Sequence, residues 1–114
     1  MEPPTTRAVV LVRFPFSDLS GAKLRPALVL AEAGRGDFLL CQITSNRYGD
    51  RLAVEFAATD FVVGSLQRVS FARPGKLFTA HESLLQGRVG LLTLESPTRV
   101  VDCVIALLRH DRGS

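Results

Sequence analysis

The sequence holds few of the residues that mark a disulfide-stapled or metal-binding protein. Its 114 residues include only two cysteines, Cys41 and Cys103, and each lies inside an apolar run. Two thiols in this setting are expected to be buried and reduced. No Cys-x-x-Cys pair or Cys/His cluster with metal-ligand spacing is present, which argues against a structural zinc. We therefore expect no metal and no cofactor.

Long apolar runs are also missing. None reaches the roughly 20 residues that a membrane span needs, and residues 1–6 lack the apolar core of a signal peptide. We expect a cytoplasmic protein without membrane contact. With 46% apolar residues, the chain can build a modest core. It is expected to form one domain over residues 1–114, with residues 1–6 as a loose tail.

Lysine is scarce, so most of the positive charge is carried by arginine. The lysines are Lys23 and Lys76, and the net charge is +3. Arginine favours planar, bidentate partners such as phosphates and carboxylates. A composition bias from a GC-rich genome explains the same pattern, so the charge alone does not select a partner.

Short runs of β-branched and apolar residues alternate with turn signals, a pattern typical of strands. The expected strands are residues 8–14, 25–32, 37–44, 52–56, 66–73 and 77–80. Residues 17–24 read as a polar loop, and residues 57–64 as either strand or loop. Arg73-Pro74-Gly75-Lys76 predicts a turn, and residues 81–87 are expected to hold one helical turn.

The end of the chain predicts a helix. Ser96 is a suitable N-cap and Pro97 suits the first helical position. Apolar residues then follow at helical spacing and form one stripe: Val101, Val104, Ile105 and Leu108. The expected fold class is therefore mainly β: a small barrel or strongly curved antiparallel sheet with a C-terminal helix packed on it.

The two central strands bring together two polar side chains. Ala33-Gly34-Arg35-Gly36 predicts a turn between them. A symmetric hairpin about Gly34 and Arg35 places Thr44 directly across from Arg25. Facing residues of an antiparallel pair point to the same side, with Cβ atoms about 4.5–5.5 Å apart. A slip of one residue would separate them, so this prediction depends on the register.

Three phrases of the sequence resemble the MazF/PemK toxins of bacterial type II toxin–antitoxin systems. They are Phe14-Pro15-Phe16-Ser17-Asp18-Leu19-Ser20-Gly21, Lys23-Leu24-Arg25-Pro26-Ala27-Leu28-Val29-Leu30 and Cys41-Gln42-Ile43-Thr44-Ser45. Gly64-Ser65, Lys76-Leu77-Phe78-Thr79 and Gly90 also fit. The resemblance covers most of residues 8–110. It departs at Arg7-Ala8, where the family often has Gly-Asp.

The resemblance implies an SH3-like barrel of the MazF/PemK/CcdB type with a C-terminal helix, usually a homodimer. It implies a metal-independent, sequence-specific endoribonuclease that cuts single-stranded RNA at short sequences and leaves 2′,3′-cyclic phosphate and 5′-OH ends. It also implies a cognate antitoxin protein as partner. The family's catalytic arginine and its catalytic threonine or serine match Arg25 and Thr44. Each also has a structural interpretation: a rim salt bridge from Arg25 to Glu55 or Asp18, and a plain strand end at Thr44.

Further residues of these phrases are candidates for RNA binding. Lys23 and Arg47 are suited to phosphates, and Phe16 is suited to stacking on a base. Ser20, Ser45 and Asn46 carry groups that read base edges. Alternatively, Phe16 belongs to the core, and the three polar residues satisfy turns. Arg73 and Lys76 are expected in a solvated turn.

Two other functions fit the same expected fold. One is a non-catalytic barrel that acts by binding protein, either a CcdB-like topoisomerase poison or an inactive relative. The other is an SH3-like nucleic-acid module without cleavage. A ribonuclease centre built on His81 and His110 would require the fold to bring these two distant residues together.

Overall fold

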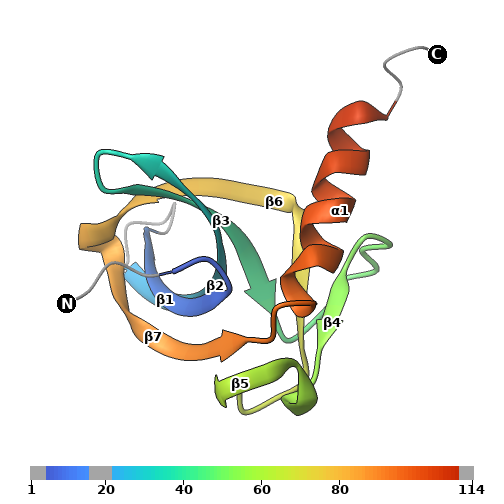
Figure 1. Cartoon of the computed structure of the whole chain (residues 1–114). Helices are drawn as coiled ribbons and strands as arrows, with labels where there is room; N and C mark the ends of the chain where they lie inside the picture. Colours follow the sequence, from blue (N-terminus) through green and yellow to red (C-terminus); the bar gives the residue numbers. More distant parts are fainter. Residues whose placement is uncertain (1–4, 16–21, 111–114) are drawn as a thin grey trace.

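The computed structural model describes residues 5–15 and 22–110. Within them, a seven-stranded antiparallel sheet curls on itself, and one α-helix follows at the C-terminal end (Figure 1). The strands are β1 (Ala8–Pro15), β2 (Ala22–Gly34), β3 (Asp37–Thr44), β4 (Val54–Phe56), β5 (Phe61–Gly64), β6 (Ser70–His81) and β7 (Leu85–Leu92). The helices are η1 (Ala58–Asp60), η2 (Glu82–Leu84) and α1 (Ser96–Arg109). The expected fold class is thus confirmed.

The order of strands in the sheet is β4-β6-β3-β2-β1-β7-β5. The central strands bury both of their faces, and alternate residues therefore enter two separate clusters. Ala27 and Val29 of β2 pack with one cluster, and Leu28 packs with the other, which includes Val100 of α1. Burial on both faces explains why β1, β2 and β3 read as continuous apolar runs.

The register of the central hairpin agrees with the prediction near the site and departs from it near the turn. Ala27 pairs with Gln42, and Leu28 pairs with Cys41, as the symmetric hairpin requires. The register then shifts twice on the way to the turn. Residues 34–36 all have positive φ, and Arg35 has φ 57°. The bulges absorb extra residues without changing the face on which the residues near the site point.

β6 contradicts the turn predicted at Arg73–Lys76. The strand runs through this segment from Ser70 to His81, and Pro74 is buried. The register between β3 and β6 shifts at this point, between Cys41 and Ile43. An irregularity of this kind tolerates proline because the residue there need not donate to the ladder. The two short strands expected on either side are therefore one strand.

Other boundaries also changed. β2 begins at Ala22, so the last part of the expected polar loop over residues 17–24 is strand. β7 was not expected at all, because Gly87, Gly90 and polar residues weaken its strand pattern. The expected helical turn is the 3₁₀ helix η2, and the ambiguous segment holds η1 and β5.

The helix prediction was right in extent and wrong in two details. The N-cap is Glu95, and the Ser96 hydroxyl instead donates to Asp60 Oδ1 at 2.8 Å. Only Val104 of the expected stripe packs against the sheet, together with Val100 and Cys103. The rest of the stripe is exposed: Val101, Ile105 and Leu108. Among the described residues, no helix is long and apolar enough to cross a membrane.

Candidate functional site

Arg25 and Thr44 lie on the same side of two neighbouring strands. Both side chains are half-buried. Arg25 of β2 pairs with Val12 of β1, and Thr44 ends β3. The ladder between β2 and β3 has its last pair at Ala27 and Gln42. Continued by two residues in the same register, it would bring Arg25 opposite Thr44. Their direct approach remains a prediction.

The Thr44 hydroxyl accepts one hydrogen bond and can still donate another. Its Oγ1 accepts a hydrogen bond from the Asn46 N–H at 3.2 Å. A hydroxyl that accepts one hydrogen bond still has a proton to donate. Asn46 Oδ1 in turn accepts from the Tyr48 N–H at 2.8 Å. The Asn46 side-chain oxygen therefore bonds within the turn, which agrees with the structural interpretation of this residue.

Phe71 connects Thr44 to two further strands. On β6 it pairs with Thr44 of β3 and with Glu55 of β4, so these three residues form one row across the sheet. The guanidinium carbon of Arg47 lies 5.9 Å from the centroid of the Phe71 ring. Arg47 thereby lies close to the strand end that carries Thr44, and its side chain is exposed.

The sequence predicted Arg73 in a solvated turn, but the residue lies on β6 in an ion pair. Its Nε donates to Asp50 Oδ2 at 2.9 Å, and both side chains are mostly covered, with 19% and 14% exposed. The hydrogen bond from Arg73, followed by that from the Leu52 N–H, holds the pKa of Asp50 below its ordinary value of 3.8. The guanidinium also lies 5.5 Å from the centroid of the Tyr48 ring.

The remaining predicted residues divide into two groups. Lys23, Ser45, Asn46 and Arg47 are exposed, and the last three follow Thr44 directly. Phe16 and Ser20 lie outside the described residues. Sequence reasoning missed Tyr48 and Asp50, which complete the cluster around Arg73. An aromatic residue within a polar turn was the available signal for Tyr48.

The two histidines do not form a centre. His81 ends β6, where its Nδ1 accepts from the Ser83 N–H at 3.2 Å, and it pairs with Asp37. His110 follows the far end of α1. Figure 1 shows the end of β6 and the end of α1 on opposite sides of the molecule.

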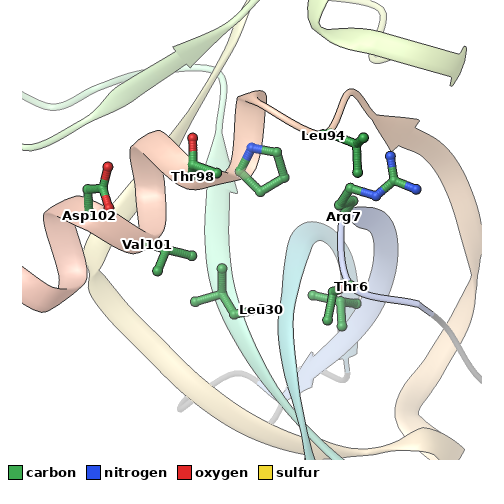
Figure 2. A pocket seen from close by; sticks show the side chains of 9 residues that line it. Thr6, Arg7, Leu30, Leu94, Thr98, Val101 and Asp102 are labelled. Atoms are coloured by element: carbon green, nitrogen blue, oxygen red, sulfur yellow. The ribbon is translucent and has the colours of Figure 1, made fainter.

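A cleft of about 380 Å³ lies elsewhere, between α1, β2 and the segments that precede β1 and follow β7 (Figure 2). Its walls are mainly apolar, with Arg7 and Asp102 near its rim, and none of the predicted site residues lines it. Arg7 has φ 78°, in the region that favours glycine, and its Nη1 donates to the Leu92 carbonyl at 3.1 Å. This is the position at which the sequence departs from the Gly-Asp of the family it resembles.

Comparison with solved structures identifies the fold. A chain in the crystal structure of MazE–MazF from Deinococcus radiodurans superposes with a TM-score of 0.77. The match covers 96% of this chain and 99% of that chain at 20% sequence identity. The chain has the MazF fold. No protein-family model and no curated protein matches the sequence.

Two mycobacterial structures share the MazF fold. One is an endoribonuclease in complex with its cognate antitoxin, with TM-score 0.69, 14% identity and coverage of 95% of both chains. The other is the Mycobacterium tuberculosis toxin MazF-mt6, with TM-score 0.67, 18% identity and coverage of 86% of this chain and 92% of that chain. The similarity therefore spans nearly the whole of this chain.

Proposed function

We propose that this chain is the toxin of a type II toxin–antitoxin system and cleaves single-stranded RNA. The observation that supports the proposal most is the placement of Arg25 and Thr44. In a MazF fold, they lie on one side of the β2–β3 pair, where the ladder ends. The exposed cations Lys23 and Arg47 add positive charge at this end. A protein that only binds another protein has no need of such a pair.

The proposed reaction uses the nucleophile that RNA itself carries. The ribose 2′-oxygen attacks the adjacent phosphorus, a 2′-O–P bond forms, and the P–O5′ bond breaks. The 2′-OH loses its proton, the 5′-oxygen gains one, and the products are a 2′,3′-cyclic phosphate and a 5′-OH. The enzyme need only align the groups, stabilise charge and help the proton transfers, so the scheme requires no metal.

Arg25 is the residue that stabilises charge in this scheme. Its guanidinium can donate two parallel hydrogen bonds to the phosphoryl oxygens. Because Arg25 is half-buried, these bonds act where water competes less, and their electrostatic effect is larger. A guanidinium carries five N–H donors and no acceptor, so it is a poor base. The Thr44 hydroxyl donates a hydrogen bond to the same phosphate.

The proposed partners are a second copy of the chain and a cognate antitoxin, which would bind and silence the enzyme in the cytoplasm. The homodimer is supported by the exposed apolar stripe of α1, since contiguous exposed apolar surface marks association sites. The second candidate function remains a non-catalytic barrel that binds protein, such as a CcdB-like poison. The MazF fold supports it as well, because a fold does not fix a function.

The test is cleavage of a long, mixed-sequence RNA by purified protein in excess EDTA. We expect discrete cuts with cyclic phosphate ends from the wild type. Arg25→Ala should lower the rate by about 10²–10³, the cost of removing one donor that stabilises transition-state charge. Arg109→Ala, at the far end of α1, is the matched control and should cleave normally. Intact RNA after incubation with folded wild-type protein would refute the enzyme and favour the protein-binding alternative.

A further inference from the structure

Tyr48 is a large aromatic residue that the fold leaves in solvent. Its exposed fraction is 66%, so packing contributes little to its position. Its φ is 53°, in the left-handed region that residues other than glycine, asparagine and aspartate rarely adopt. A residue held in such a conformation is fixed by its surroundings, and such residues gather at ligand-binding sites.

Two sets of contacts hold Tyr48 in place. The Asn46 side chain accepts the Tyr48 N–H at 2.8 Å, and the Asn46 N–H donates to Thr44 Oγ1. This chain of hydrogen bonds ties the backbone of Tyr48 to the proposed catalytic residue. The position of Tyr48 relative to Thr44 is therefore set by the local fold of the loop.

The ring itself rests on a fixed cation. Arg73 lies over the Tyr48 ring at 5.5 Å from its centroid. The guanidinium cannot move freely, because its Nε donates to Asp50 Oδ2 at 2.9 Å. Asp50 is fixed in turn by its second oxygen, Oδ1, which accepts the Leu52 N–H at 2.9 Å. The ring is thus supported from one side while most of its surface stays open.

From this arrangement we propose that Tyr48 is a stacking platform for an unpaired base of the RNA. Every nucleobase has an aromatic face, and single-strand binders place such bases on exposed aromatic side chains. The inference rests on the proposed function, since Thr44 would hold the phosphate of the same strand. Tyr48 is then a positioning residue: by fixing a base near the cut, it brings the phosphate to Arg25 and Thr44.

The composition of the chain supplies a direct readout. Tyr48 is its one tyrosine, and there is no tryptophan, so intrinsic fluorescence excited at the tyrosine band reports this ring alone. The titrant is a mixed-sequence single-stranded RNA with 2′-O-methyl groups, which lacks the attacking hydroxyl and stays intact. We expect saturable quenching of the tyrosine emission. A binding isotherm by anisotropy of labelled RNA, without quenching, would place the RNA away from the ring.

Two variants separate the ring from its backbone. Tyr48→Gly removes the ring and suits the positive φ, so the fold should persist. It should raise KM roughly 5- to 150-fold, the range for losing one stacked base, with kcat within about threefold. Tyr48→Phe keeps the aromatic face and should match the wild type in KM. Equal KM values for Tyr48→Gly and the wild type would overturn the proposal even if quenching occurs.

The outcomes distinguish this inference from the function on which it rests. A wild type that cleaves RNA without quenching or a KM effect at Tyr48 refutes the platform alone. A wild type that binds and quenches but never cleaves supports the platform and refutes the endoribonuclease. A folded wild type that neither binds nor cleaves refutes both.

Discussion

At the scale of single residues, several side chains of the candidate site already make contacts within the protein. The Thr44 oxygen accepts from the loop that follows it, and Arg73 is committed to Asp50. Arg47 lies over Phe71. These contacts restrict side chains that would otherwise be mobile in solvent, and restricted groups lose less entropy when they bind a ligand.

Substitution of Thr44 tests whether its hydroxyl acts in the proposed cleavage. Thr44→Val has the same shape and removes the hydroxyl, which supplies the proton that would bond the phosphate and the oxygen that accepts from Asn46. Since a hydrogen bond to a charged group contributes about 1.5–3 kcal/mol, cleavage should slow roughly 10- to 150-fold. Thr44→Ser, which keeps the hydroxyl, should stay near the wild-type rate. Single-turnover cleavage measures both, and equal rates for Val and Ser would remove Thr44 from the reaction.

Cys41 gives a prediction about alkaline stability. Burial raises the pKa of its thiol from 9.0 to about 12. Above pH 9 the unfolded chain therefore loses this proton while the folded chain keeps it. The free energy of unfolding should fall from pH 9 towards about 12, by at most about 1.4 kcal/mol per pH unit. Urea unfolding under reducing conditions at pH 7.5 and 10.5 measures the fall.

The matched comparison uses the two cysteines. Cys41→Val should make the fall between these pH values smaller, because the raised group is gone. Cys103→Val retains Cys41, so the free energy of unfolding should fall between these pH values as it does in the wild type. The same pH dependence in wild type and Cys41→Val would show that other groups cause the alkaline loss.

At the scale of elements, two junctions hold the fold together. One joins η1 to the start of α1 through Asp60. Its Oδ1 accepts from the Ser96 hydroxyl and from Arg99 Nη2, each at 2.8 Å, and its Oδ2 accepts from the Ala57 N–H. This network replaces the N-cap that the sequence predicted at Ser96.

Removal of the Asp60 carboxylate should weaken this junction. Asp60→Ala leaves the Ala57 N–H without its acceptor and removes the carboxylate that Ser96 and Arg99 bond, and the expected cost is about 2 kcal/mol. Chemical denaturation measures the change, with Asp102→Ala, an exposed carboxylate of α1, as control. A loss no larger than that of the control would show that the network contributes nothing to stability.

The Asp60 carboxylate also predicts that the protein loses stability at acid pH. Burial alone would raise the pKa of Asp60, but the hydrogen bonds from Ala57 and Ser96 and the charge of Arg99 outweigh it and lower the pKa below 3.8. A depressed folded pKa gives stability that is present above the unfolded value of 3.8 and is lost as pH falls below it. Stability of wild type and Asp60→Ala should therefore converge between pH 5 and the acid transition.

The second junction is the close approach of β5 and β7. Gly64 pairs with Gly90, and a Cβ at Gly90 would lie 2.7 Å from carbons of the Phe61 ring. Gly90→Ala should destabilise the protein by about 1–3 kcal/mol, because overpacking forces the ring or strand to shift. Gly75→Ala, with no atom within 4 Å of its added Cβ, is the control and should be near neutral. Thermal unfolding compares them.

At the scale of the whole molecule, the exposed apolar side of α1 predicts an association surface. Val101, which lines the cleft of Figure 2, is 38% exposed, and Ile105 on the same helix is 42% exposed. If a second copy binds there, light scattering should give twice the chain mass of 12.4 kDa. Ile105→Glu should then give the monomer mass with an unchanged circular dichroism spectrum, because a buried unpaired charge opposes association. Gln86→Glu, which adds the same charge on β7, should remain dimeric.

Local pattern was sufficient for the features that depend on neighbours in sequence. The hairpin of β2 and β3, its register near Ala27 and the extent of α1 all follow from apolar periodicity and from glycine in a turn. The expectation that Arg25 and Thr44 share one face follows from the same arithmetic. The sequence alone thus determined the fold class, and the family resemblance added the expectation that Arg25 and Thr44 are catalytic.

Tertiary contacts decided the rest. β7 has weak strand propensity and exists because β1 and β5 pair with it on either side. β6 continues through Pro74 because the sheet accommodates an irregularity there. Ser96 is not the N-cap of α1, because its hydroxyl donates to the carboxylate of Asp60, 36 residues away in sequence. The support of Tyr48 by Arg73 and Asp50 likewise joins a loop to β6. Contacts between residues distant in sequence have no local signature, so only the folded chain could reveal them.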